Sequence, residues 1–233
     1  MFRNLLTSAV FAGLGAGLIA AALQFVFVIP LLLEGELYET GARIHFATDS
    51  STQSISEAPG LGGEWARHGM TVAFNLVSYT GYGFVLVALM GLAALRGFAL
   101  TARTGLLWGI CGFIAVQLAP AMGLPPELPG TPAAELQPRQ IWWVSTIIAT
   151  AAGLGLIVFA RGFLPLLGIV LIAAPQLIGA PHLDTYFGVA PPELSAQFVT
   201  QSLGCALVGW SVLGFLGAWF LTRTAEATRP AFA

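Results

Sequence analysis

Carboxylates and imidazoles are the side chains of this sequence with the clearest potential for chemistry. The segment "EGELYE" places Glu34, Glu36 and Glu39 close together, and "PHLD" places His182 next to Asp184. Imidazole nitrogen and carboxylate oxygen form the ligand set of borderline divalent ions such as Co²⁺, Ni²⁺ or Zn²⁺. These residue types indicate contact with a divalent metal ion, provided that the fold brings them to one face. The alternative is that they are solvated groups in surface loops.

A short motif, PPEL, occurs twice, and each copy carries one carboxylate. The first copy contains Glu127 and the second contains Glu193. Pro125 and Pro126 cannot continue a helix, and Gly123 gives the chain freedom to turn. We therefore expect a helix to end before the first copy, and the two glutamates to lie in matching positions outside the membrane.

No catalytic or nucleotide-binding motif accompanies these residues. The sequence has no CxxC, no HExxH and no GxxxxGK[ST] pattern, and its two cysteines stand alone in apolar runs. Lysine is absent, and the nine arginines form no basic stripe, which argues against nucleic-acid binding. The sequence therefore predicts neither an enzyme, nor a resident cofactor, nor a nucleic-acid partner.

The composition is that of an integral membrane protein surrounded by lipid. Of the 233 residues, 57% are apolar and 9% are charged, and the mean hydropathy is +0.83. We predict one all-α membrane domain, residues 1–233, formed by a polytopic helix bundle. Six segments reach or approach the roughly 20 residues of a spanning helix: Leu5–Leu33, Gly69–Leu95, Gly105–Met122, Gln140–Ala160, Phe163–Ala180 and Phe198–Leu221. Because the fifth is the shortest and contains two prolines, five spans are the alternative.

Arginines predict the orientation of the bundle, since cytoplasmic flanks collect positive charge. With the N-terminus inside, six arginines are cytoplasmic and three are external, whereas ten of the eleven acidic residues are external. Both termini are therefore predicted to be cytoplasmic. The acids and all three histidines then fall on the external face, together with a long loop, residues 34–68.

The predicted spans contain neutral polar side chains but no Arg, Asp or Glu. Gln24, Gln117 and Gln176 lie in the outer halves of the three odd-numbered spans, each near a proline, and Asn75 lies in the second span. Such groups usually form hydrogen bonds between helices, but together they are dense enough to line a narrow polar path. Their recurrence also predicts a weak threefold repeat of hairpins, unless the prolines simply end helices near the interface.

Small residues predict where the first helix packs. Ala9, Gly13, Gly17 and Ala21 recur at four-residue spacing, which lets two helix backbones approach closely in lipid.

Several long segments resemble the CbtA family, the larger subunit of predicted bacterial cobalt transporters. They are "IPLLLEGELYE", "QLAPAMGLPPELPG", "RQIWWVSTIIATAAGLGL" and "APQLIGAPH" followed by "APPELSAQF". The likeness covers about Phe2 to Leu221. Members of this family are usually described as having five spans.

The resemblance implies cobalt transport for cobalamin biosynthesis across the bacterial cytoplasmic membrane. It also implies a small partner, CbtB, with one membrane span and a histidine-containing tail. On this basis, we expect an external ion-gathering set, with Gln117 and Gln176 as the next contacts inward. The set consists of Glu34, Glu36, Glu127, His182 and Glu193. His45, which lies in a low-complexity loop, receives no coordinating role.

A second hypothesis remains open at this point. Every polar and small residue inside the spans also has an adequate explanation in packing. The chain would then be a non-transporting structural or accessory subunit of a larger membrane complex.

Overall fold

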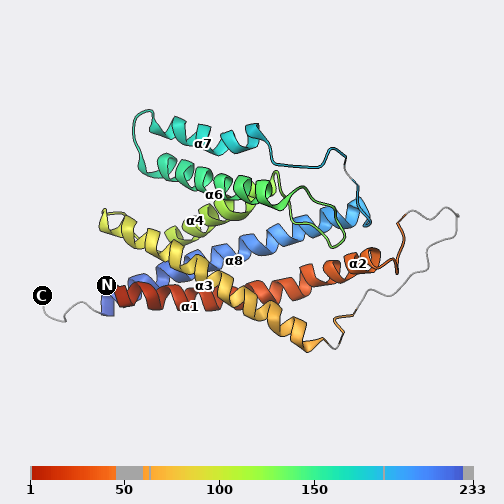
Figure 1. Cartoon of the computed structure of the whole chain (residues 1–233). Coiled ribbons are helices and arrows are strands. Elements are labelled where there is room, and N and C mark those ends of the chain that lie inside the picture. Colours follow the sequence, from red (N-terminus) through yellow and green to blue (C-terminus); the bar gives the residue numbers. More distant parts are fainter. Residues whose placement is uncertain (1, 46–59, 63, 186, 228–233) are drawn as a thin grey trace, which may run out of the picture. The chain divides into compact units, whose positions relative to one another are not determined.

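The computed structural model describes residues 2–45, 60–62, 64–185 and 187–227, with side chains up to Arg223. Helices are the only regular secondary structure in these ranges (Figure 1). Two of them, η1 and η2, are five-residue π-helices, and they continue directly from one α-helix into the next. In chain order the elements are α1 (Phe2–Leu23), η1 (Gln24–Val28), α2 (Ile29–Glu39), α3 (Trp65–Leu95), α4 (Ala102–Phe113), η2 (Ile114–Leu118), α5 (Ala119–Ala121), α6 (Leu136–Phe159), α7 (Leu164–Ile178) and α8 (Pro192–Ala227).

Five helical stretches in the described residues are long and apolar enough to cross a membrane, as an all-α membrane bundle requires. They are Phe2–Glu39, Trp65–Leu95, Ala102–Ala121, Leu136–Phe159 and Pro192–Arg223. The predicted count of six full spans is too high, because the expected fifth span forms α7, with only 15 residues. At 1.5 Å per residue α7 is about 22 Å long, shorter than the roughly 30 Å hydrocarbon core of a bilayer. The helix lengths support the five-span alternative.

The helices extend further at their polar ends than hydropathy predicted. Glu34, Glu36 and Glu39 lie within α2, not in the loop that follows it. Likewise, Glu193 lies in the first turn of α8, which begins at Pro192. A helix can continue past the lipid because water hydrates its polar side chains there, and hydropathy marks only the apolar part. The remainder of the predicted loop 34–68 lies partly outside the described residues.

The chain folds into two compact units. Unit 1 comprises Met1–Leu23, Trp65–Ile114 and Cys205–Ala233, and unit 2 comprises Gln24–Glu64 and Ala115–Gly204. Since α8 and two other helical stretches run from one unit into the other, the single membrane domain expected from the sequence stays a prediction.

Unit 1 is held together by close helix contacts at glycines. The predicted small-residue face of α1 packs on α3: a Cβ atom added at Gly17 would lie 2.9 Å from the backbone oxygen of Asn75. One added at Gly83 of α3 would lie 2.8 Å from the oxygen of Ala9. A second contact joins α4 to α8, where a Cβ at Gly105 would meet the backbone of Gly214. Each of the four helices in this unit is therefore packed at backbone distance against another, α1 against α3 and α4 against α8, and the prediction for α1 is confirmed.

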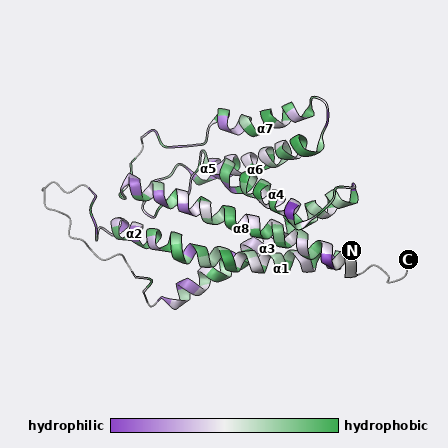
Figure 2. Cartoon of the chain, turned by 180° about the vertical axis from the view of Figure 1, so that it is seen from behind, coloured by the Kyte–Doolittle hydropathy of each residue, from purple (hydrophilic) through white to green (hydrophobic). Residues whose placement is uncertain are grey.

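Unit 2 contains an antiparallel pair, α6 and α7, which lie side by side in Figures 1 and 2. Gly153 and Gly168 form the crossing point, because a Cβ added at either would come within 2.6 Å of the other's backbone oxygen. Near the other end of the pair, the indole Nε1 of Trp142 donates a hydrogen bond to the carbonyl oxygen of Pro175, at 3.2 Å. The buried indole and the close glycines fix α7 along α6.

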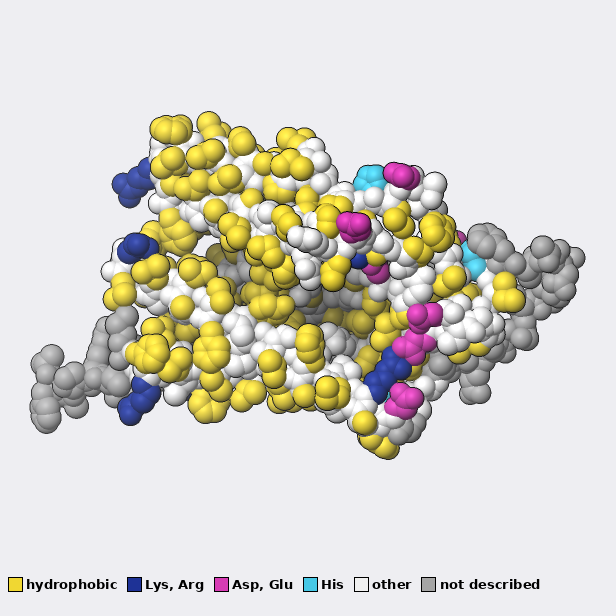
Figure 3. Space-filling model, viewed as in Figure 1, with side chains coloured by type: hydrophobic (Ala, Val, Ile, Leu, Met, Phe, Trp, Pro, Cys, Tyr) yellow, Lys and Arg dark blue, Asp and Glu magenta, His cyan; other side chains and the backbone are white. Residues whose placement is uncertain are grey.

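The helices expose much apolar surface, as lipid contact requires. Figure 3 shows hydrophobic side chains covering the sides of the helices, and Leu177 of α7 is 86% exposed. Because such surface is unfavourable in water, this pattern fits a protein embedded in lipid.

Candidate cation-gathering end of unit 2

Three segments of unit 2 meet at one end of it. The loop after α5 inserts Leu128, which is only 3% exposed, against Gly35 of α2. Two residues later, Gly130 adopts a positive φ of 75° and lies against Glu39 of α2 and Val189 of the segment before α8. These contacts gather the end of α2, the loop after α5 and the segment before α8 at one end of unit 2.

A second contact brings the end of α7 to the same loop. Gly123, at the start of the loop after α5, lies against Ala180, which follows α7, and against the ring of Trp142. The glutamate of the first PPEL motif, Glu127, and the imidazole of His182 follow these contact points by a few residues. Both therefore belong to the loop end of unit 2.

Charge is divided unequally between the two units. All eight acidic residues whose side chains are described belong to unit 2, together with three arginines, a formal excess of five negative charges. The described side chains of unit 1 include five arginines and no acid. Acidic side chains gather at the loop end in Figure 3, and Figure 2 shows α2 turning hydrophilic toward its loop end. Unit 2 thus carries the field that attracts cations.

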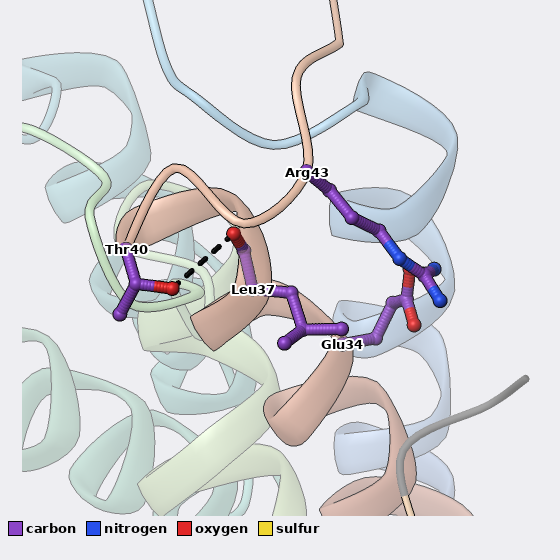
Figure 4. A network of polar contacts seen from close by, with 4 residues as sticks. All are labelled: Glu34, Leu37, Thr40 and Arg43. Carbon is purple, nitrogen blue, oxygen red and sulfur yellow. Dashed lines mark hydrogen bonds and ion pairs between the residues drawn. The ribbon is translucent and has the colours of Figure 1, made fainter. Parts of the chain in front are cut away.

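Glu34 is paired with an arginine of its own loop. The chain folds back after α2, where the amide of Arg43 donates to the carbonyl oxygen of Leu37 at 2.9 Å. The Arg43 guanidinium then forms an ion pair with the Glu34 carboxylate, and both side chains are about one-fifth exposed (Figure 4). Figure 4 also shows the hydroxyl of Thr40 donating a hydrogen bond to the carbonyl oxygen of Leu37, which caps the C-terminal end of α2.

Glu127 has the same kind of partner. Arg139, in the first turn of α6, donates from its Nη2 to the Glu127 carboxylate at 2.9 Å. The side chains are 21% and 33% exposed, so water still reaches the pair. Two of the five predicted metal contacts are therefore engaged by arginine.

The other three predicted contacts lie in different settings. Glu36 is half-buried on α2. Glu193 lies in the first turn of α8, where the partial positive charge of a helix N-terminus stabilises a carboxylate. His182 is exposed, and its Nδ1 lies 2.9 Å from the carbonyl oxygen of Leu183.

The structure does not bring these residues together as one coordination sphere. Within the described ranges, no three His, Cys, Asp or Glu side chains are grouped closely enough to hold a metal ion. The five predicted contacts are carried by four separate segments, and arginines occupy two of the carboxylates. What the arrangement provides is a dispersed acidic surface, which can concentrate a hydrated cation but does not enclose it.

The predicted polar path is distributed over both units. Gln24 begins η1 and Gln117 lies in η2, both half-buried. Gln176 donates from Nε2 to the carbonyl oxygen of Ala119 at 2.9 Å, so it links α7 to the end of the third span. Asn75 belongs to unit 1, and its Nδ2 donates to the carbonyl oxygen of Thr71.

Sequence reasoning missed two features of this region. One is the pairing of Arg43 and Arg139 with carboxylates. At the level of the sequence, arginines were counted only to predict the orientation of the bundle in the membrane. The other is the pair of π-helices. Their signal is present in the sequence, because each ends two residues before a proline, Pro30 or Pro120.

A family model described as "Probable cobalt transporter subunit (CbtA)" matches residues 2–222, nearly the whole chain. No curated protein and no solved structure matches it. In the described residues, five helices long and apolar enough to cross a membrane and an acidic loop end are consistent with a transporter subunit, and this is not a family of enzymes. The protein belongs to the CbtA family of probable cobalt transporter subunits.

Proposed function

We propose that this chain is the larger subunit of a permease for a divalent transition-metal ion, with cobalt as the first candidate. It would lie in the cytoplasmic membrane of a bacterium, with both termini in the cytoplasm and the loop end of unit 2 facing outward. The observation that carries the proposal is the gathering of carboxylates at this end, in a chain whose family is that of a probable cobalt transporter subunit.

The first step of transport is electrostatic concentration of the ion. A surface with an excess of negative charge raises the local concentration of cations and the rate at which they arrive. Glu36, Glu193 and the imidazole of His182 make the initial contacts. Glu34 and Glu127 join when an arriving divalent ion displaces their arginines. This exchange is feasible because a pair as open to solvent as Glu127–Arg139 contributes about 0–1 kcal/mol.

The second step is passage between the apolar parts of the helices, which carry no formal charge. Moving a bare divalent ion into such a region has a large desolvation cost, so the ion keeps part of its water or gains ligands from elsewhere. The glutamines Gln24 and Gln117 offer neutral amide oxygens along the way. Imidazoles from a small one-span CbtB-like partner with a histidine-containing tail would supply the remaining ligands.

Cobalt uptake tests this proposal directly. Cells would express the chain with its small partner, the chain alone, and the Glu127→Gln and Glu193→Gln variants with the partner. We expect uptake that requires both subunits and falls several-fold in each variant. Glu135→Gln, which neutralises an exposed carboxylate outside the ion-gathering set, is the matched control. Unchanged uptake in all strains would remove the proposal.

A second function is favoured by one observation, the lack of a three-residue metal group in the described residues. The chain would then be a structural or accessory subunit of a larger membrane complex that transports nothing. Purification separates the two functions. Stoichiometric recovery with a larger assembly, and no bound cobalt by elemental analysis, would support the accessory role.

A further inference from the structure

Three continuous helical stretches pass from unit 1 into unit 2, two of them at a π-helix and the third at a glycine within an α-helix. Two of the boundaries, Leu23/Gln24 and Ile114/Ala115, fall at the start of η1 and inside η2. The third, Gly204/Cys205, falls at a glycine inside α8. We call these three positions the joints.

Prolines explain the two π-helical joints. Pro30 and Pro120 are each the second residue of the α-helix that follows the π-helix. A proline has no N–H for the carbonyl four residues earlier, which is that of Val26 or Val116, and its ring would collide with that carbonyl in a regular α-helix. The wider π turn relieves the collision. Bends in helices occur at such places, because the local hydrogen bonding is already incomplete.

The third joint has weak local restraint for a different reason. Gly204 has no side chain to restrict its backbone, and an added Cβ atom would meet nothing within 4 Å. No tertiary contact therefore stiffens the helix at the glycine itself. All three joints combine weak local restraint with continuity of the helix.

The interior of each unit is held much more firmly. In unit 1, a Cβ at Gly83 would lie 2.8 Å from a backbone oxygen of α1, and in unit 2 Gly153 and Gly168 lock α6 to α7. Helices packed at backbone distance move as one body, so bending is expected at the joints between the bodies.

We propose that the three joints are hinges at which unit 2 reorients relative to unit 1. This inference rests on the proposed function, because it supplies the motion by which a transporter exposes its ion to one side of the membrane and then to the other. Unit 1, which the glycine contacts make stiff, is the base for this motion, and unit 2 carries the acidic surface with it.

Distance measurements between spin labels test the hinges. The labels are placed at Ala99→Cys in unit 1 and Ala133→Cys in unit 2, both exposed loop positions, in a protein whose own cysteines, Cys111 and Cys205, are replaced by alanine. We expect a broad or two-peaked distance distribution that changes when Co²⁺ is added. A single narrow distribution, unchanged by Co²⁺, would overturn the proposal.

Proline variants test the two π-helical joints. The double variant Pro30→Ala and Pro120→Ala restores the missing N–H groups and should narrow the distribution of distances between the spin labels. Cobalt uptake should fall by more than about tenfold, as expected when a hinge step limits turnover. Pro165→Ala is the control, because Pro165 lies in the first turn of α7, where no N–H is needed. Equal effects of the double variant and the control would contradict the assignment.

Glycine variants test the third joint and remain informative if the proline variants do not fold. Gly204→Ala adds a methyl group in open space, and so does its control Gly155→Ala, within α6. We expect Gly204→Ala to narrow the distribution of label distances and to slow cobalt uptake, and Gly155→Ala to change neither. If the wild type neither binds nor transports cobalt, the proposed function fails, whereas the label distances still decide whether the hinges exist. If cobalt is transported but the distances stay fixed, only the hinges fail.

Discussion

The side-chain amide of Gln176 donates a hydrogen bond to the backbone carbonyl oxygen of Ala119, 2.9 Å away and 57 residues earlier in the chain. Ala119 lies near the end of the third span, directly after η2, and its carbonyl oxygen also accepts from the amide of Met122 at 3.3 Å. The side chain of Gln176 therefore adds a second donor from another helix and helps to cap the end of the span. This bond gives Gln176 a structural role within the predicted polar path.

Removing this cap should destabilise unit 2. We expect Gln176→Ala to lower the free energy of unfolding by about 1 kcal/mol, the usual contribution of one half-buried hydrogen bond. Thermal unfolding in detergent measures the change. Gln137→Ala, at an exposed position near the start of α6, should leave the transition where it is. An equal loss in both variants would mean that the bond to Ala119 contributes nothing.

Loss of the hydrogen bond from the indole of Trp142 should also destabilise unit 2. The ring of Trp142 has a second role, because it packs next to Gly123. The Trp142→Phe variant keeps an aromatic ring but loses the hydrogen bond to Pro175 and the indole atoms Cη2 and Cζ2 that lie next to Gly123. We expect a cost of about 1–3 kcal/mol from the lost hydrogen bond and the smaller ring together, although the carbonyl of Pro175 still accepts from the amide of Gly179. Trp142→Ala should cost more, since it also leaves a cavity. Stability of Trp142→Phe equal to that of wild type would contradict this account.

The close packing at Gly13 in unit 1 can be tested by adding a methyl group there. A Cβ at Gly13 would collide with the backbone of Thr80, which cannot turn aside as a side chain can. We expect Gly13→Ala to destabilise the protein by about 1–3 kcal/mol, as overpacking does. Gly81→Ala on α3 is the matched control, because its Cβ meets nothing within 4 Å. Folding yield and thermal unfolding of the two variants should differ clearly.

Much of this packing was accessible from the sequence, because it follows from local composition. The spacing of Ala9, Gly13, Gly17 and Ala21 predicted the face of α1 that packs on α3. The apolar runs likewise located the spans. Their ends were harder to place, since Glu34 lies in α2 beyond its apolar part and Glu193 lies in the first turn of α8, before the apolar part begins.

The candidate site was less predictable, because it depends on contacts between distant segments. Sequence reasoning identified Glu34 and Glu127 as acidic groups near helix ends. That each is held by an arginine 9 or 12 residues later depends on how the loop folds back, which residue types alone do not reveal. The dispersal of the five predicted contacts is likewise a matter of tertiary structure.

The arginine pairs predict a competition between guanidinium and metal ion. In Arg139→Gln, the Glu127 carboxylate is released, so we expect the apparent affinity for Co²⁺ to rise by up to about fivefold, the equivalent of a pair contributing about 1 kcal/mol. Arg139→Lys should restore most of the competition. Raising the ionic strength should weaken Co²⁺ binding in both proteins, since exposed charges are screened. Binding by isothermal titration measures these changes, and a lower affinity in Arg139→Gln would show that Arg139 supports the site.

The central claim, that an acidic end of unit 2 faces the outside and gathers cations, is tested most directly by labelling cysteines in intact cells. Glu127→Cys and His182→Cys are each exposed to a membrane-impermeant maleimide in a protein otherwise free of cysteine, with Arg161→Cys at the α6–α7 turn as the internal reference. The account predicts that the first two react from outside and the third only after permeabilisation. Reaction of position 127 and position 182 from opposite sides, or of both only from within, would contradict it.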